Sequence, residues 1–167
     1  PVSLYNIKQF CNAKGKTMEY RMAVKEDIEL LMEVRLEMLR IVNELPDDFA
    51  FSDELTENSR QYFLQGNQST SIAVENKKII ACASISYIEV MPTFSHPTGK
   101  RAHLMNVYTN AAYRRQGISR SLVQMLIDDA KKKHITEISL DATDSGRPLY
   151  TSLGFSDSDE CMTLKLF

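Results

Sequence analysis

The sequence contains little glycine, proline or cysteine. Its 167 residues include 6 Gly, 5 Pro and 3 Cys, with 43% hydrophobic and 25% charged residues. This composition excludes collagen, a coiled coil and a disordered chain, and it is sufficient for a substantial core. Cys11, Cys82 and Cys161 are odd in number and lack C-x-x-C spacing. The cysteines therefore indicate neither a disulfide framework nor a zinc site, and they favour a reducing cytoplasm.

Neither sign of charge dominates, and no long apolar run is present. The 20 Lys and Arg against 22 Asp and Glu leave a net charge of -2 and a pI near 6.0, so no strong field favours nucleic acid or anionic lipid. No apolar run approaches the roughly 18 to 20 residues of a membrane span, and no basic segment followed by an apolar stretch marks an export signal. We expect a soluble, cytoplasmic protein without nucleic-acid or membrane partners.

The first 17 residues show no clear period, whereas a regular pattern begins at Met18. Two interpretations of residues 1–17 stay open, a translated leader before a natural start at Met18 and an N-terminal arm. The length predicts one domain, which we expect over 18–167. The segment 1–17 is expected to contribute nothing to a functional site.

Hydrophobic periodicity predicts a mixed α/β fold with the element order β-α-α-β-β-β-α-β-α-β. Asn76-Lys77 reads as a hairpin turn, Asp53 as the cap of the second helix and Gly66 as its end. The helices are expected to flank the faces of a central mixed sheet. Strands are predicted at 18–23, 69–75, 78–90, 101–109, 135–141 and 161–167, and helices at 26–43, 54–65, 118–133 and 145–152.

The first predicted helix is amphipathic, with one exception. Its apolar face comprises Ile28, Leu31, Met32, Leu39 and Val42. Its solvated stripe comprises Glu29, Glu33, Glu37 and Arg40. Arg35 breaks the pattern, because the spacing places it on the apolar face, where a charge needs a partner. A buried ion pair and contact with a substrate are both open for Arg35.

One segment combines a strand, a basic turn with a glycine, and the start of a helix. It spans residues 104–126, LMNVYTNAAYRRQGISRSLVQML. Free backbone N–H groups and the positive end of a helix dipole meet at such a turn, which suits a phosphate group. An ordinary helix start with solvated arginines fits the spacing as well. The residues assigned to this anion site are Arg114, Arg115, Gln116, Gly117, Ile118 and Ser119.

Two other nucleotide-binding motifs are excluded. Gly15-Lys16-Thr17 matches the end of a P-loop, but the position five residues before Gly15 is Phe10. A dinucleotide-binding loop needs three glycines, whereas residues 110–125 contain only Gly117.

The segments V-Y-T-N-A-A-Y-R-R-Q-G-I-S and A-T-D-S-G-R-P-L-Y-T-S-L-G-F together resemble the acetyl-CoA signature of the GNAT N-acetyltransferases. The resemblance covers about residues 18–167 and implies the GNAT fold, with acetyl-CoA as co-substrate and an amine as acceptor. Arg114 to Ser119 match the pyrophosphate loop Q/R-x-x-G-x-G/A, with Ser119 as a departure at the last position. The family's bulged strand carries over to Val107, Tyr108 and Thr109, whose backbone N–H groups would hold the pantetheine arm and thioester. Thr143 stands where many relatives have an Asn that contacts the cofactor.

The implied chemistry gives Tyr150 a role. An amine that attacks a thioester forms an oxyanion, which a backbone N–H at a strand bulge can stabilise by roughly 3 to 4 kcal/mol. The leaving thiolate, with a pKa of about 8.5, can take a proton from a tyrosine, whose reference pKa is about 10. Tyr150 is the candidate for this general acid. The alternative is a core tyrosine that packs under the G-F turn.

No residue stands out as the base that removes a proton from the attacking ammonium. Each candidate is more often a solvated surface residue than a base, and a water relay is equally compatible. Cys82 has small neighbours on one sheet face, so a covalent acetyl-cysteine is disfavoured. The candidate bases are Glu33, Glu37, Glu89, His103 and Asp141.

These observations predict an N-acetyltransferase that moves an acetyl group from acetyl-CoA to the primary amine of a small molecule or peptide, by direct attack in a ternary complex. The alternative is a CoA-binding sensor or degenerate acetyltransferase without turnover. No metal is implied, and a homodimer is compatible with the sequence.

Overall fold

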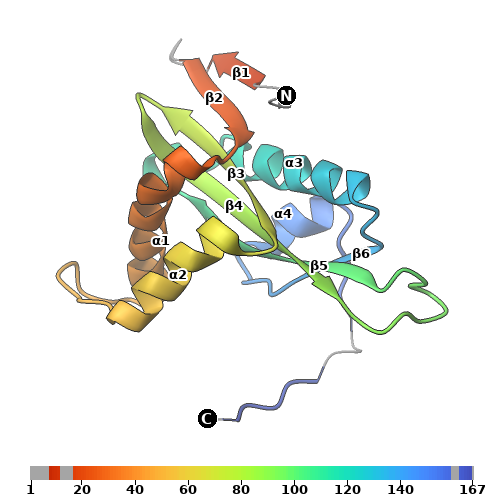
Figure 1. The fold of residues 1–167 in the computed structure, drawn as a ribbon. Coiled ribbons are helices and arrows are strands. Elements are labelled where there is room, and N and C mark those ends of the chain that lie inside the picture. Colours follow the sequence, from red (N-terminus) through yellow and green to blue (C-terminus); the bar gives the residue numbers. More distant parts are fainter. Residues whose placement is uncertain (1–7, 12–16, 159–161, 167) are drawn as a thin grey trace.

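The computed structural model describes residues 8–11, 17–158 and 162–166 (Figure 1). Within them, a mixed sheet of six strands lies at the centre, in the order β1-β2-β3-β4-β5-β6. Neighbours from β1 to β5 pair antiparallel, whereas β5 and β6 pair parallel. The strands are β1 (Lys8–Cys11), β2 (Thr17–Met22), β3 (Gln68–Glu75), β4 (Lys78–Glu89), β5 (Lys100–Thr109) and β6 (Glu137–Leu140).

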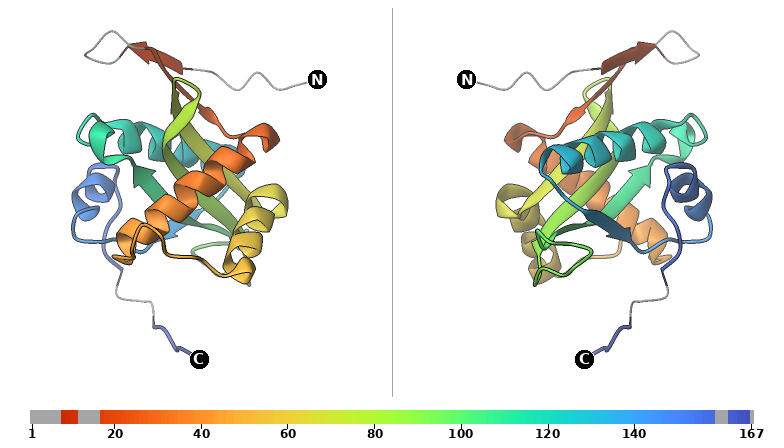
Figure 2. Two further views of the ribbon diagram at one scale, coloured as in Figure 1. Left: turned by 90° about the vertical axis from the view of Figure 1, so that its left-hand side faces the viewer. Right: turned by 90° about the vertical axis from the view of Figure 1, so that its right-hand side faces the viewer.

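Helices cover both faces of the sheet (Figure 2). One face carries α1 (Ile28–Val42) and α2 (Asp53–Gln65), and the other carries α3 (Ile118–Lys132) and α4 (Arg147–Ser152). The short 3-10 helices η1 (Lys25–Asp27) and η2 (Ala111–Tyr113) precede α1 and α3. Because β5 and β6 run parallel, the chain must cross over between them, and α3 makes this crossover. Within the described residues, no helix combines the length and apolarity needed to cross a membrane.

The side chains of β4 alternate between two apolar clusters. On the α3 face, Ile85 packs with Leu122 and Leu126, and on the α1 face, Cys82 packs with Leu31. Burial of each large aliphatic side chain contributes about 1.5 to 3 kcal/mol. The alternation also fixes which polar side chains of β4 can reach α1 and α2.

The start of α1 is held by a buried carboxylate. Asp27 is 6% exposed and accepts hydrogen bonds from the N–H of Val24 at 2.8 Å and from the Arg21 guanidinium at 2.5 and 2.8 Å. Burial raises the pKa of Asp27, but these hydrogen bonds and the charge of Arg21 outweigh burial and lower it overall. The pair therefore fixes the N-terminal end of α1 relative to β2.

Several local predictions are confirmed. Asn76 and Lys77 have left-handed φ angles of 51° and 62°, as a tight turn between β3 and β4 requires. Gly66 ends α2. The strands predicted at 78–90 and 101–109 and the helix predicted at 118–133 agree with β4, β5 and α3 to within one residue at each end.

The closing strand predicted over 161–167 is wrong for the part that the structure describes. Residues 162–166 form no regular secondary structure (Figure 1), and Met162, Leu164 and Leu166 are 97%, 82% and 76% exposed. Alternating apolar residues form a strand only where a partner supplies the ladder of hydrogen bonds. Cys161 and Phe167 lie outside the described residues.

A strand that the sequence pattern did not predict lies within residues 1–17. β1 pairs with β2 in a register that places Lys8 opposite Tyr20 and Cys11 opposite Thr17. The segment 8–11 thus extends the edge of the sheet at β2. Residues 1–7 and 12–16 lie outside the described part of the chain.

The helix details also need correction. The hydroxyl of Ser52, rather than Asp53, caps α2 by accepting from the N–H of Leu55 at 3.2 Å. On α1, Val42 is 66% exposed, whereas Val34 and Met38 are buried. The buried stripe of α1 therefore differs from the predicted one. It includes Val34 and Met38 and excludes Val42, because α1 packs against both the sheet and α2.

Candidate active site

β5 bulges where it passes the middle of β4. The ladder shifts between Cys82 and Ser84, and at this point β5 contributes Asn106 and Val107 opposite one residue of β4. Two residues against one define a β-bulge. Asn106 has a left-handed φ of 54°, a conformation that Asn adopts more readily than most residues. The bulge that the family resemblance implies is present in this strand.

The outer edge of β5 is open beyond the bulge. The ladder between β5 and β6 ends with Leu104 opposite Leu140. From 105 to 109, this edge has no strand partner among the described residues. An extended ligand that carries amide groups can pair with such an edge as an added strand. The open stretch includes Val107, Tyr108 and Thr109, the residues expected to offer their backbone to the pantetheine arm.

The loop that follows leads directly into α3. Gly117 is the N-cap residue, with a φ of 76°, and a Cβ added there would meet nothing within 4 Å. The first helical hydrogen bond runs from the N–H of Ser121 to the carbonyl of Gly117 at 3.1 Å. No described protein group accepts from the N–H groups of residues 116–120. These groups and the positive end of the helix dipole are thus free to bind an anion.

Two side chains tie this loop to the end of β5. The Nε of Arg114 donates to the carbonyl of Thr109 at 3.1 Å, and the hydroxyls of Ser119 and Thr109 lie 2.7 Å apart. Arg115 and Gln116 are exposed, and Ile118 is buried in the core beneath the loop. The loop and the open edge of β5 are therefore held in a defined relation.

α4 is attached to the same end of α3. Arg120 donates to the hydroxyl and carbonyl oxygens of Ser152 at 2.5 and 3.3 Å. Tyr150 is half-buried and packs edge-to-face on Phe155, with ring centroids 6.0 Å apart. Burial raises the pKa of Tyr150, and no described residue forms a hydrogen bond with its hydroxyl. The tyrosine thus packs at the G-F turn as one interpretation holds, with a protonated hydroxyl that is still free for the other.

Thr143 organises the turn into α4. Its hydroxyl accepts from the N–H of Gly146 at 3.3 Å and lies 3.2 Å from the hydroxyl of Ser145. This local role occupies part of the hydrogen-bonding capacity of Thr143. Its contact with the cofactor stays a prediction.

Arg35 approaches the bulge from the face opposite α3. Its Nη1 donates to Oδ1 of Asn106 at 3.2 Å, and the Asn106 amide donates to the hydroxyl of Ser84 at 3.3 Å. The Cys82 thiol lies 3.5 Å from the Asn106 carbonyl, to which it donates. Sequence reasoning missed Asn106, although an Asn just before V-Y-T in a strand expected to bulge was a usable signal. The contact with Arg35 joins residues 71 positions apart, which no local pattern reveals.

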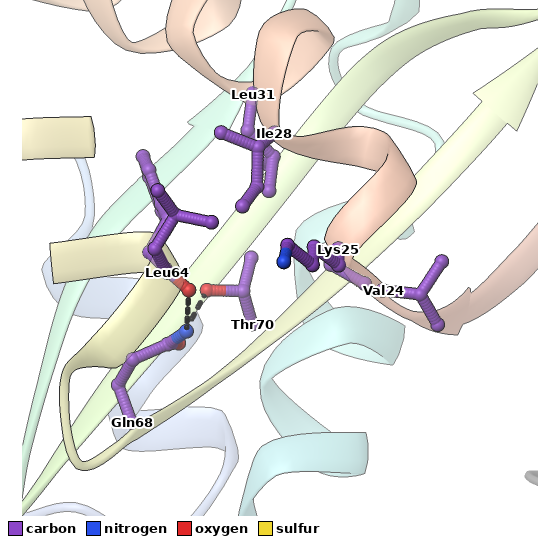
Figure 3. Close-up of a pocket in the computed structure, with 9 residues that line it drawn as sticks. Val24, Lys25, Ile28, Leu31, Leu64, Gln68 and Thr70 are labelled. Carbon is purple, nitrogen blue, oxygen red and sulfur yellow. Dashed lines mark hydrogen bonds between the residues drawn. The ribbon is translucent and has the colours of Figure 1, made fainter. Parts of the chain in front are cut away.

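A small pocket of about 160 Å³ lies on the same side of the sheet as Arg35, between the start of α1, the end of α2 and β3 (Figure 3). Figure 3 shows Ile28 and Leu31 on one side and Gln68 and Thr70 on the other. Thr70 forms hydrogen bonds of 2.8 Å with both Gln68 and Ser84, so the pocket is linked to the bulge. Typical ligand pockets have about 300 to 1,000 Å³. This pocket can therefore hold only a small group.

Glu37 differs from its predicted place on the solvated stripe. Its carboxylate accepts from the hydroxyl of Tyr108 at 2.7 Å and from the amide of Asn110 at 3.4 Å. Burial and the neighbouring Glu37 raise the pKa of Tyr108 well above its usual range. Glu37 is half-buried, with Tyr108 of β5 and Asn110, which follows β5, both donating to its carboxylate.

The other candidate bases lie elsewhere. Glu33 and Glu89 are exposed, and the Nδ1 of His103 lies 2.9 Å from the hydroxyl of Ser139. The side chain of Asp141 is fully exposed and lies 3.7 Å from His103. Of the five candidates, only Glu37 is hydrogen-bonded to a residue in the open stretch of β5.

Cys82 is 1% exposed, and burial raises the pKa of its thiol to about 12. A thiol with such a pKa is almost entirely protonated at neutral pH, and only the thiolate is a strong nucleophile. The position therefore fits the expectation of direct attack better than a covalent acetyl-cysteine.

Comparison with known proteins identifies the family to which this chain belongs. The model of the acetyltransferase (GNAT) family matches residues 36–155. The glucosamine 6-phosphate N-acetyltransferase of Trypanosoma brucei brucei is 26% identical over 89 residues, which are 53% of this chain and 58% of that protein. The match thus spans little more than half the length of this curated relative.

Solved structures agree over most of the chain. A predicted acetyltransferase from Clostridium acetobutylicum, solved with acetyl-CoA, is 35% identical with a TM-score of 0.78, covering 89% of this chain and 96% of that one. A GCN5-related N-acetyltransferase from Ralstonia eutropha JMP134 is 26% identical with a TM-score of 0.74, covering 89% and 98%. The resemblance inferred from the two sequence motifs is confirmed, and the chain belongs to the acetyltransferase (GNAT) family.

Proposed function

We propose that the protein transfers an acetyl group from acetyl-CoA to a primary amine by direct attack in a ternary complex. One observation carries the proposal: free backbone N–H groups at 116–120 lie next to a β5 edge that has no described strand partner. The N–H groups suit a pyrophosphate, and the edge suits the amides of an extended pantetheine arm. The open space at Gly117 leaves room for a phosphate to approach the backbone.

In the proposed reaction, different residues carry out different steps. Acetyl-CoA, when bound, supplies a thioester carbonyl for the amine to attack. Backbone N–H groups at the bulge of β5 stabilise the negative charge that develops on the carbonyl oxygen. Tyr150 donates its proton to the departing sulfur, and burial keeps this proton on the phenol at neutral pH by raising its pKa. Glu37, held by Tyr108 and Asn110, takes the proton that the ammonium loses.

The proposed setting is the cytoplasm, where Cys82 stays a free thiol. A net charge of -2 supports small-molecule or peptide acceptors rather than nucleic acid.

Release of CoA thiol from acetyl-CoA over a panel of amines and peptides tests the proposal, with CoA binding measured by calorimetry on the same protein. We expect release that depends on an amine. CoA binding without release for any acceptor would contradict the enzyme and identify a CoA-binding module. The Gly117→Asp variant described below is the control, because it should lose both signals.

A further inference from the structure

Arg35 is a half-buried cation that has no anionic partner within the described chain. Its hydrogen bond goes to the neutral amide oxygen of Asn106, at 3.2 Å, and none of the ion pairs between described residues includes it. The nearby Cys82 thiol and Tyr62 phenol are neutral at physiological pH, since burial raises both of their pKa values. Burial correspondingly lowers the pKa of Arg35.

Several other arginines of this chain have a partner for their charge. Arg21 pairs with Asp27, Arg60 with Glu29, Arg101 with Glu137 and Arg147 with Asp157. Arg40, on the same helix as Arg35, lies over the ring of Phe51 at 5.1 Å. Removing a charge from water without a counter-charge destabilises the folded protein. The structural ion pair that was one of the two open roles for Arg35 is therefore not formed by the described residues.

The position of Arg35 connects it to the proposed reaction. Asn106 belongs to the bulge of β5, where the thioester is proposed to lie, and Arg35 contacts it from the α1 face. The hydroxyls of Ser86 and Tyr62, 2.7 Å apart, lie on the same face between β4 and α2. On this face of the sheet, opposite α3, the polar groups near the bulge are the guanidinium of Arg35, the amide of Asn106 and the hydroxyls of Ser84, Ser86 and Tyr62.

The geometry of the guanidinium indicates what it can bind. Of its five N–H donors, the structure commits one to Asn106. The planar arrangement of the others matches two oxygens of a carboxylate or a phosphate. We propose that the acceptor amine carries an anionic group, a carboxylate or a phosphate, and that Arg35 binds this group and so directs the amine toward the β5 bulge. The inference rests on the proposed acetyl transfer and names the acceptor class for that site.

Acetylation of matched acceptor pairs tests the proposal. The pairs are glycine with glycinamide, 2-aminoethyl phosphate with ethanolamine, and an amino sugar phosphate with its free sugar, with rates referred to the unprotonated amine. For the wild type, we expect kcat/KM to favour the anionic member of at least one pair by about tenfold or more. The carboxylate and phosphate pairs show which oxyanion is preferred.

Variants of Arg35 separate substrate binding from a structural role. Arg35→Gln should abolish the preference for the anionic member mainly by raising KM, as expected for lost ground-state binding, and Arg35→Lys should restore part of it. The affinity for CoA should not change. Arg60→Gln removes a charge of the same sign from α2 and should leave the preference intact. Because Arg35 is a desolvated cation, the melting temperature of Arg35→Gln should equal or exceed that of the wild type.

Three results would overturn the inference: equal use of neutral and anionic amines, a preference that survives Arg35→Gln, or a melting temperature several degrees lower in that variant. If no amine is acetylated, the proposed function fails, and binding of the anionic amines to the CoA-loaded protein decides the inference separately. Calorimetric binding that Arg35→Gln abolishes would uphold an anionic ligand at this site. Absence of such binding would contradict the inference that this site binds an anionic ligand.

Discussion

Gly117, Tyr150 and Glu37 belong to three elements, yet each is linked to the end of β5. Gly117 follows β5 through a loop that Thr109 holds on both sides. Tyr150 lies on α4, which Arg120 binds to the first turn of α3. Glu37 accepts from Tyr108. At the residue scale, a substitution of a few atoms can remove each proposed role while the surrounding packing stays the same.

Gly117→Asp should lower the affinity for CoA by about tenfold or more, because a carboxylate would repel the pyrophosphate at the helix start. The fold should survive, since an added Cβ meets nothing within 4 Å and Asp is among the residues that tolerate a left-handed φ. Gly117→Asn is the matched control, with the same shape and no charge. Calorimetric titration with CoA measures both variants, and equal losses would show that the cause is steric rather than electrostatic.

Tyr150→Phe keeps the ring on Phe155 and removes only the hydroxyl. General acid catalysis contributes about 10² to 10⁴ in rate, so the single-turnover rate should fall in that range while CoA binding and stability change little. The wild-type rate should decline at high pH, where the phenol of Tyr150 ionises with a pKa that burial raises, and the Phe variant should lack this decline. A Phe variant with the wild-type rate would show that Tyr150 is a packing residue and not the general acid.

Glu37→Gln preserves an oxygen that can accept from Tyr108 but removes the base. We expect the single-turnover rate at neutral pH to fall by about 10² or more, with no change in CoA affinity. Glu33→Gln is the control, since Glu33 is an exposed carboxylate on the same helix. Equal effects of the two substitutions on rate would exclude a specific role for Glu37.

At the scale of elements, the site depends on how β5 and α1 are fixed. The bulge turns Asn106 toward α1, while the end of the β5–β6 ladder at Leu104 leaves the outer edge of β5 open. α1 is oriented at its start by Asp27, eight residues before Arg35. If the start of α1 were less firmly held, the positions of both Arg35 and Glu37 would therefore change.

Asp27→Asn should lower the free energy of unfolding at neutral pH by about 1.5 to 3 kcal/mol, the usual worth of hydrogen bonds to a charged group. The pKa of Asp27 is lowered in the folded protein, so its stabilisation is present above the unfolded pKa of about 3.9 and is lost as pH falls through the folded value. The difference between wild type and variant should therefore shrink below about pH 4.

Urea unfolding at a series of pH values measures this effect. The exposed Asp48→Asn should match the wild type at every pH. A wild-type-to-Asp27→Asn difference that stayed constant down to pH 3 would show that the charge of Asp27 does not stabilise the fold.

At the scale of the whole molecule, the sheet separates the N-terminal edge from the site. β1 pairs only with β2 among the described strands, whereas β5 and β6 form the opposite edge. The proposed CoA and acceptor positions lie on the two sides of β5. Stability and function should thus respond differently to changes at β1.

A chain that begins at Met18 should bind CoA as the longer chain does, because it keeps β5, α3 and α4. Its melting temperature should fall by only a few degrees, since about 1 kcal/mol shifts it by roughly 2 to 4 °C in domains of this size. Calorimetry and thermal unfolding of the two chains check both points. A marked loss of CoA affinity would show that residues 1–17 contribute to the site.

The sequence alone determined what depends on neighbours along the chain. Helix and strand periodicity, the Asn76-Lys77 turn and the glycine at the start of α3 are local features, because backbone sterics and capping act over a few residues. The motifs at 107–119 and 142–155 were sufficient to identify the family, since they combine turn chemistry with fixed spacing. Nothing local, however, distinguished the apolar alternation at 162–166 from that of a paired strand.

Only the tertiary structure decided which distant side chains meet. The contacts of Arg35 with Asn106 and of Glu37 with Tyr108 each join residues 71 positions apart. They depend on the register of β5 against β4 and on the rotation of α1 about its axis, and a shift of one residue in either would turn these side chains away. The anion-binding loop could be recognised from the sequence because one turn of chain builds it, whereas the acceptor side is assembled from α1, α2, β4 and β5 and exists only once they pack.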